Sequence, residues 1–124
     1  MKDAKPVLLA IAVALVLKLF VFDFIVAQGY SMEPVIADGT ILVINRLRYG
    51  IRLPSNRYLV RWSQPKLGEI VVFFTPTGEL AVKRCILIEG QSFYAHGDNL
   101  IASYDSRAYG KVPVDNIIGK VLGY

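Results

Sequence analysis

The sequence predicts a mainly β protein, in which a single N-terminal transmembrane helix is followed by a small, mostly antiparallel β domain. Two observations predict this fold class. Residues 7–27 form an apolar run, and the chain of 124 residues is 54% hydrophobic, which exceeds the usual share in a globular protein. Segments rich in β-branched and aromatic residues then follow one another, separated by turn-forming residues. The length allows one small domain beyond the helix.

The apolar run over residues 7–27 is the predicted membrane anchor. A spanning helix needs about 20 mostly apolar residues, and only Lys18 and Asp23 interrupt this run. Near a helix end, Lys18 can reach the lipid headgroups with its long side chain. A cleaved signal peptide is the alternative. It is disfavoured because Ile25 occupies the position where a cleavage site needs a small residue.

The charges before the apolar run predict its orientation. Lys2 and Lys5 precede it, so the positive-inside rule predicts a cytoplasmic N-terminus with the remaining chain on the outer face of the membrane. The predicted organisation is a cytoplasmic stub and transmembrane anchor over residues 1–27, and a β-rich domain over residues 28–124.

From Gly29 onward the pattern predicts strands. The predicted strands cover residues 40–44, 69–74, 80–88 and 92–95, with a shorter one at 58–62. Residues 75–79 contain Pro76 and Gly78 and predict a hairpin turn that joins the second of these strands to the third. A loop is predicted at residues 54–56.

Lys83 lies within one of the predicted strands. Successive side chains of a strand point to opposite faces, so Ala81, Lys83, Cys85 and Leu87 are expected to share one face. Apolar surroundings disfavour an ammonium ion and leave a neutral amine that can act as a base. On the pattern alone, an edge strand with the amine in water is the alternative.

Ser31 follows the apolar run and is a candidate nucleophile. A serine attacks only if a neighbouring group takes its proton. The chain has one histidine, His96, and no evident Ser-His-Asp grouping, so Lys83 is the candidate general base. A serine that hydrogen-bonds its own turn is the alternative interpretation.

Four segments in this order resemble the conserved boxes of bacterial type I signal peptidases, which are membrane-anchored serine–lysine proteases. The resemblance covers nearly the whole chain. The matching segments are Gly29-Tyr30-Ser31-Met32-Glu33-Pro34, Asp38-Gly39-Thr40-Ile41-Leu42-Val43, Leu67-Gly68-Glu69-Ile70-Val71-Val72-Phe73 with Val82-Lys83-Arg84, and Gly97-Asp98-Asn99 with Ser103, Asp105-Ser106-Arg107, Gly110 and Val112-Pro113.

The resemblance implies a fold, an activity and a location. It implies a β domain of signal peptidase type that cleaves signal peptides from exported preproteins after small residues. It further implies a single-pass protein of the bacterial cytoplasmic membrane, with preproteins and the lipid bilayer as partners. In this interpretation Ser31 is the nucleophile, Lys83 is the general base and an acyl-enzyme is the intermediate.

The remaining roles also come from the resemblance. The backbone N–H of Ser31 is the expected oxyanion donor, and Ser103 is expected to orient the lysine. The expected structural supports of the site are Gly97, Asp98, Asn99, Asp105 and Arg107. The family binds its substrate as an added strand, and the expected lining residues are Gly29, Met32, Pro34, Ile70, Val72 and Ala81.

The chain departs from the family pattern at two places, which indicates a short and somewhat divergent member. Glu89 and Gln91 stand where the family usually has proline and aspartate, and Leu100 stands where arginine is common. At Gly29 some members carry a serine hydroxyl, and other members have glycine as this chain does. Two other functions stay open: a processing protease dedicated to one substrate, of the conjugation or pilus type, and a membrane-tethered β domain that binds without cutting.

Composition argues against other classes. The net charge of +4 is modest and its cations are scattered, so no nucleic-acid partner is expected, and an anionic lipid surface fits this charge better. One histidine and one cysteine give no metal-ligand spacing. We expect no metal and no cofactor.

Overall fold

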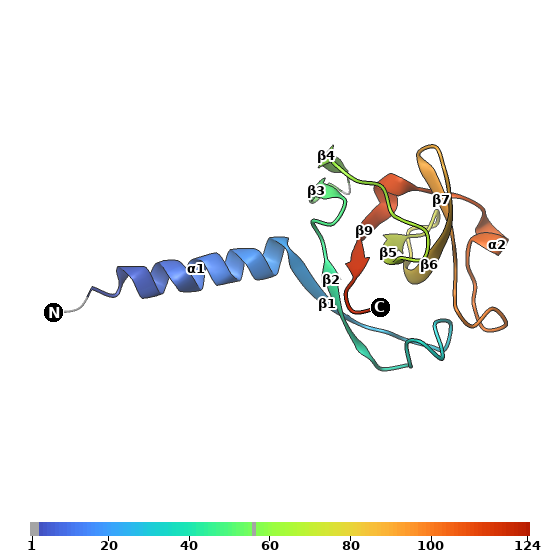
Figure 1. Cartoon of the computed structure of the whole chain (residues 1–124), viewed down its shortest axis with the longest axis horizontal. Coiled ribbons are helices and arrows are strands. Elements are labelled where there is room, and N and C mark those ends of the chain that lie inside the picture. The colour runs from blue at the N-terminus through green and yellow to red at the C-terminus, as the bar shows by residue number, and fades with distance from the viewer. Residues whose placement is uncertain (1–2, 56) are drawn as a thin grey trace.

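The computed structural model describes residues 3–55 and 57–124 of the chain. Lys2 of the predicted stub and Asn56 of the predicted loop lie outside the described residues. A helix projects from a β domain (Figure 1). The elements in chain order are α1 (Lys5–Phe20), β1 (Phe22–Val26), β2 (Ile41–Asn45), β3 (Gly50–Arg52), β4 (Tyr58–Arg61), β5 (Ile70–Phe74), β6 (Leu80–Glu89), β7 (Ser92–His96), α2 (Ser106–Tyr109), β8 (Val112–Pro113), η1 (Val114–Asn116) and β9 (Ile117–Val121).

The predicted transmembrane helix is wrong. Helix α1 has 16 residues, which extend it about 24 Å, short of the roughly 30 Å hydrocarbon core of a bilayer. Within the described part of the chain, no helix is both long and apolar enough to cross a membrane. The helix ends at Phe20, and Phe22–Val26 of the predicted span pairs with β2 as strand β1. Hydropathy did not separate the two elements because apolar runs of this kind occur in buried helices and in strands alike.

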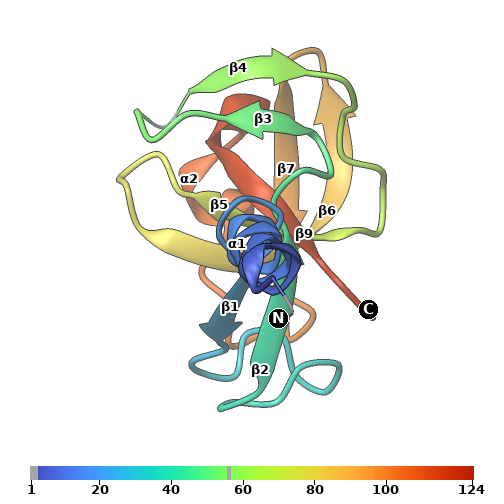
Figure 2. The same cartoon turned by 90° about the vertical axis from the view of Figure 1, so that its left-hand side faces the viewer.

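Seven strands form one antiparallel sheet in the order β1-β2-β9-β5-β6-β7-β8, and β3 and β4 form a separate ribbon (Figure 2). The mainly β prediction is therefore confirmed. The predicted hairpin is present, with register pairs from Ile70↔Arg84 to Phe74↔Leu80. Strand β1 ends the sheet, so one of its edges has no neighbour among the described strands.

Strand β5 is buried on both faces and divides the core into two clusters. Val71 and Phe73 belong to the first cluster. There the Phe73 and Phe93 rings pack in a T-shaped arrangement, with their centroids 5.1 Å apart. Ile70 and Val72 belong to the second. The second cluster also contains Met32 and Ile36, the apolar residues that anchor the loop carrying Ser31, and the remaining members are Leu42, Ile44 and Val121.

Strand β6 places Lys83 as its alternation predicts. Lys83 is 7% exposed and Cys85 is fully buried. A register shift between Cys85 and Leu87 then turns the strand, so Leu87 is 49% exposed and its predicted place on the same face is wrong. Pairing with β7 begins only at Arg84, so the first residues of β6 have β5 as their one described strand neighbour.

Candidate active site

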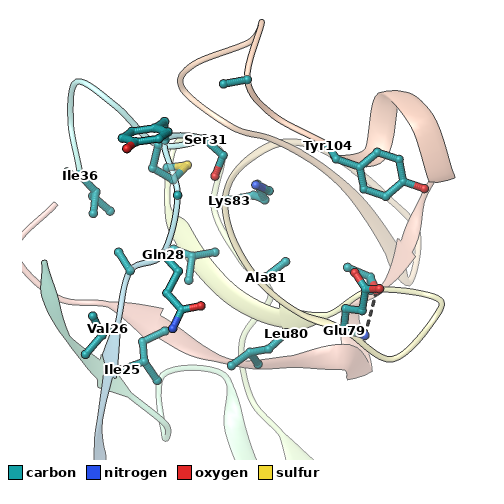
Figure 3. Close-up of a pocket in the computed structure, with 17 residues that line it drawn as sticks. Ile25, Val26, Gln28, Ser31, Ile36, Glu79, Leu80, Ala81, Lys83 and Tyr104 are labelled. Carbon is teal, nitrogen blue, oxygen red and sulfur yellow. Dashed lines mark hydrogen bonds between the residues drawn. The ribbon is translucent and has the colours of Figure 1, made fainter. Parts of the chain in front are cut away.

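A cavity of about 530 Å³ lies between strand β1 with its following loop and the first half of β6 (Figure 3). Ser31 and Lys83 lie toward one end of it, and Leu80 and Glu79 toward the other. Its lining residues are Ile25, Val26, Ala27, Gln28, Gly29, Tyr30, Ser31, Met32, Ile36, Thr75, Glu79, Leu80, Ala81, Val82, Lys83, Ala102 and Tyr104. The structure therefore brings the predicted nucleophile and the predicted base into one cavity.

Ser31 lies in the loop that joins β1 to β2. Backbone hydrogen bonds close the base of this loop, from Ala27 N to Thr40 O at 2.8 Å and from Gly39 N to Ala27 O at 2.7 Å. Within it, the Gly29 N–H donates to the Asp38 carboxylate at 2.8 Å. Gly29 has a φ of +83°, which glycine adopts without steric cost. The loop is thus held at both ends, and Ser31 itself stays partly exposed.

A second loop, over residues 97–99, holds the backbone of the predicted nucleophile by a hydrogen bond. The Asn99 N–H donates to the Ser31 carbonyl at 2.9 Å. Asp98 forms a two-point ion pair with Arg84, in which the Arg84 Nε and Nη2 each donate at 2.8 Å. Because Arg84 is the neighbour of Lys83 in β6, this pair ties the strand of the lysine to the loop that holds the serine.

Lys83 is buried, and burial lowers its pKa because the ammonium form loses its hydration. The negative charge of Asp105 opposes this effect, and the positive charge of Arg107 adds to it. The described residues offer the amine no salt-bridge partner within 4.0 Å. A lysine with a lowered pKa supplies more of the neutral amine that a general base requires.

Three of the predicted supports, Gly97, Asp105 and Arg107, form a hydrogen-bonded network with Ser103 beside the cavity. Ser103 donates its hydroxyl proton to Asp105 at 2.7 Å and accepts the Gly97 N–H at 3.1 Å. Asp105 also accepts from Gly97 N at 2.9 Å and from the Arg107 guanidinium. Burial alone raises the pKa of Asp105, but the hydrogen bonds from Arg107, Ser103 and Gly97 outweigh it and hold this pKa well below its usual range.

This network fixes the Ser103 hydroxyl proton. Because the proton points to Asp105, the Ser103 oxygen can meet a further partner only as a hydrogen-bond acceptor. That direction suits a residue expected to orient Lys83. The orienting role itself stays a prediction.

The predicted lining residues divide into three groups. Gly29, Met32 and Ala81 line the cavity. Pro34 lies instead at a second, open hollow beside Asp98 and Asn99. Ile70 and Val72 are fully buried in the second core cluster.

Twelve of the seventeen described lining residues were not among the predicted site residues, and three of them illustrate why. Gln28, Glu79 and Tyr104 line the cavity, although each is exposed and flanks a turn or loop. A sequence pattern cannot tell such residues from ordinary solvent-facing ones. The one available signal is proximity, because Gln28 and Glu79 lie within four residues of Ser31 and Lys83.

Comparison with known proteins agrees with these observations. The family described as "Signal peptidase, peptidase S26" matches residues 1–93 and 87–123. Proteins named signal peptidase I are similar to the chain in Bacillus caldolyticus (27% identity over 94% of this chain), Haemophilus influenzae (28% over 89%) and Helicobacter pylori (24% over 90%). The chain spans 86% of the first relative, but only 31% and 47% of the other two.

Proposed function

Because the chain belongs to the signal peptidase family peptidase S26, we propose that it removes signal peptides from exported preproteins by cutting after small residues. Family membership makes the chain a serine peptidase and therefore a hydrolase. The observation that carries the proposal is the common cavity of Ser31 and Lys83, in which burial lowers the pKa of the lysine.

The proposed mechanism uses the neutral amine of Lys83. The amine takes the proton of Ser31 as the serine oxygen attacks the scissile carbonyl. The protonated lysine then gives this proton to the leaving amine as the peptide bond breaks, which leaves an acyl-enzyme and a neutral Lys83. In the second half, Lys83 takes a proton from the attacking water and returns it to the Ser31 oxygen as the ester bond breaks. The Ser31 N–H has no hydrogen-bond acceptor among the described residues, which supports its role as an oxyanion donor.

Two strand edges without a neighbour among the described strands support the binding of an extended peptide. Strand β1 lies at the end of the sheet, and β6 lacks a β7 neighbour before Arg84. Both border the cavity, so a peptide between them can make main-chain hydrogen bonds as an added strand. Ala81 and Ala102 in the lining leave room for small substrate side chains near the catalytic residues.

The predicted location at the outer face of the bacterial cytoplasmic membrane stays a prediction, as does contact with a lipid bilayer. Helix α1 supports such contact because it exposes large apolar side chains, among them Leu8, Leu9 and Leu15.

The proposal is tested by incubating the full chain with a preprotein in detergent micelles and identifying the new N-terminus by mass spectrometry. We expect one cut after a small residue. Ser31→Ala is expected to leave the preprotein intact, whereas Ser55→Ala, at an exposed loop serine, keeps the activity. If several preproteins stay uncut, general signal-peptide processing is ruled out, and a dedicated substrate or a binding role takes its place.

The protonation state of Lys83 determines the expected pH dependence of cleavage. Only the neutral amine can accept the serine proton, so kcat/KM is expected to rise with pH, about tenfold per unit on the acidic side of the lysine pKa. Because burial lowers this pKa, the rising part of the kcat/KM curve (its acidic limb) should have its midpoint below the ordinary lysine pKa of 10.5. A pH profile of kcat/KM on a peptide substrate measures it.

Asp105 provides the control for this profile. Its negative charge raises the pKa of Lys83, so Asp105→Asn is expected to shift the limb to lower pH, whatever it does to the maximal rate. A limb at the same pH in both proteins, or a midpoint at the ordinary lysine value, would show that another group limits the rate.

A further inference from the structure

Glu79 lies at the end of the cavity that is remote from Ser31 (Figure 3). It has the one carboxylate among the described lining residues. The described residues include no Lys, Arg or His within 4.0 Å of that carboxylate. An acidic group therefore lies unpaired in the cavity of a chain whose net charge is +4.

Hydrogen bonds fix the backbone of Glu79 at this position. Thr75 N donates to the Glu79 carbonyl at 2.8 Å, and Glu79 N donates to the Thr75 hydroxyl at 3.1 Å. Gly78 N donates to the Thr75 carbonyl at 2.9 Å and closes the turn. Thr75 is itself buried, at 7% exposure. The carboxylate thus extends from an anchored point on the cavity wall.

The separation of Glu79 from Lys83 along β6 indicates which substrate residue Glu79 can contact. Glu79 precedes Lys83 by four residues, which is about 13 Å along an extended strand at about 3.3 Å per residue. A peptide that pairs with the open edge of β6 advances by the same rise. A substrate residue four or five positions from the scissile bond therefore comes opposite Glu79.

The charge of the cavity makes this position selective. In the proposed mechanism Lys83 is neutral when it acts as a base, so Glu79 then carries the formal charge of the lining. Near a protein surface a pair of opposite charges attracts more strongly than in bulk water, and a pair of like charges repels more strongly. A cationic substrate side chain gains from this field, and an anionic one is penalised.

We propose that Glu79 is a specificity-determining residue that selects substrates with lysine or arginine four or five residues from the scissile bond, on the side of the peptide that runs along the start of β6. This inference rests on the proposed function. It adds a charge requirement, remote from the cut, to the expected preference for small residues.

The test measures kcat/KM of the full chain on a series of peptides. A neutral reference peptide carries Ala one and three positions before the cut, and its relatives carry Arg, Gln or Glu at the fourth or fifth position on either side of the bond. We expect the Arg peptide to exceed the Gln peptide by about two- to fivefold at one of these positions, and Gln to exceed Glu. The preference should weaken toward about 0.5 M salt.

Substitutions assign the preference to its source. Glu79→Gln is expected to bring the Arg-to-Gln ratio to about one, and Glu79→Lys to invert it, because the charge is removed or reversed. Glu89→Gln is the matched control, since it removes the same charge from an exposed position at the other end of β6 and should keep the wild-type ratio.

The outcomes separate this inference from the proposed function. If the reference peptide is cut and the ratio is one at all positions, or is unchanged in Glu79→Gln, then Glu79 is an ordinary solvated turn residue and the inference is overturned. If the reference peptide is not cut, the proposed function fails instead. Fluorescence anisotropy of labelled Arg and Gln peptides with wild type and Glu79→Gln then decides on the charge preference alone.

Discussion

Lys83→Ala is expected to lower kcat/KM by about 10⁴-fold, because it removes the amine that the proposed mechanism uses to take the proton of Ser31. The fold should survive, since the lysine lies at the cavity wall and an alanine fits the same strand. The measurement is peptide cleavage near the pH optimum, with circular dichroism to compare the folds.

Two controls accompany this variant. Lys111→Ala removes an exposed lysine outside the cavity and should keep full activity. The double variant of Ser31→Ala and Lys83→Ala should lose no more than either single variant, because residues that act as one unit are not additive. Additive losses in a folded double variant would contradict a shared proton-transfer step, and full activity in Lys83→Ala would eliminate the lysine as the base.

Gly97→Ala is expected to have the second largest effect, a loss of about 100-fold or more in kcat/KM. Gly97 is buried, and a Cβ there would lie 2.2 Å from the Ser103 Oγ and 2.5 Å from the Ser31 carbonyl oxygen. The methyl group therefore displaces the nucleophile's backbone and the predicted orienting serine together. Misplacement of reacting groups by about 1 Å can cost on the order of 100-fold in rate.

The same substitution overpacks the interior, so we also expect about 1–3 kcal/mol of destabilisation, measured by urea unfolding. Gly90→Ala is the control for a general effect of replacing glycine. Gly90 has a φ of +61°, and a Cβ there meets no atom within 4 Å, so its variant should lose some stability while keeping its activity. Wild-type activity in Gly97→Ala would mean that neither serine needs its present position.

Local patterns predicted the central hairpin and the place of Lys83. The β5–β6 turn contains Pro76 and Gly78, and the flanking residues have strand character, so both strands and their pairing followed from the sequence. The alternation of side chains along strand β6 correctly predicted that Lys83 and Cys85 share a buried face. The prediction failed only beyond the register shift, where Leu87 is exposed. Such a shift depends on the partner strand, which a single segment does not specify.

The N-terminal segment could not be divided from its sequence. Residues 7–27 are apolar except for Lys18 and Asp23, but the helix ends at Phe20 because the following residues gain strand partners from β2, which is distant in the sequence. The prediction that Ile70 and Val72 line the substrate site was wrong for a related reason. Both faces of β5 are buried, so neither Ile70 nor Val72 could be assigned to a cavity or to the core by alternation.

The unpaired strand edges that border the cavity have a consequence for self-association. An open edge that can accept a peptide can equally accept the edge of a second copy, which is how sheet proteins polymerise and aggregate. A charged side chain beside such an edge opposes this pairing, because close strand contact between copies would remove the charge from water without neutralising it. Glu79 is such a side chain, so its charge opposes edge-to-edge pairing of two copies at the side of the cavity where β6 begins.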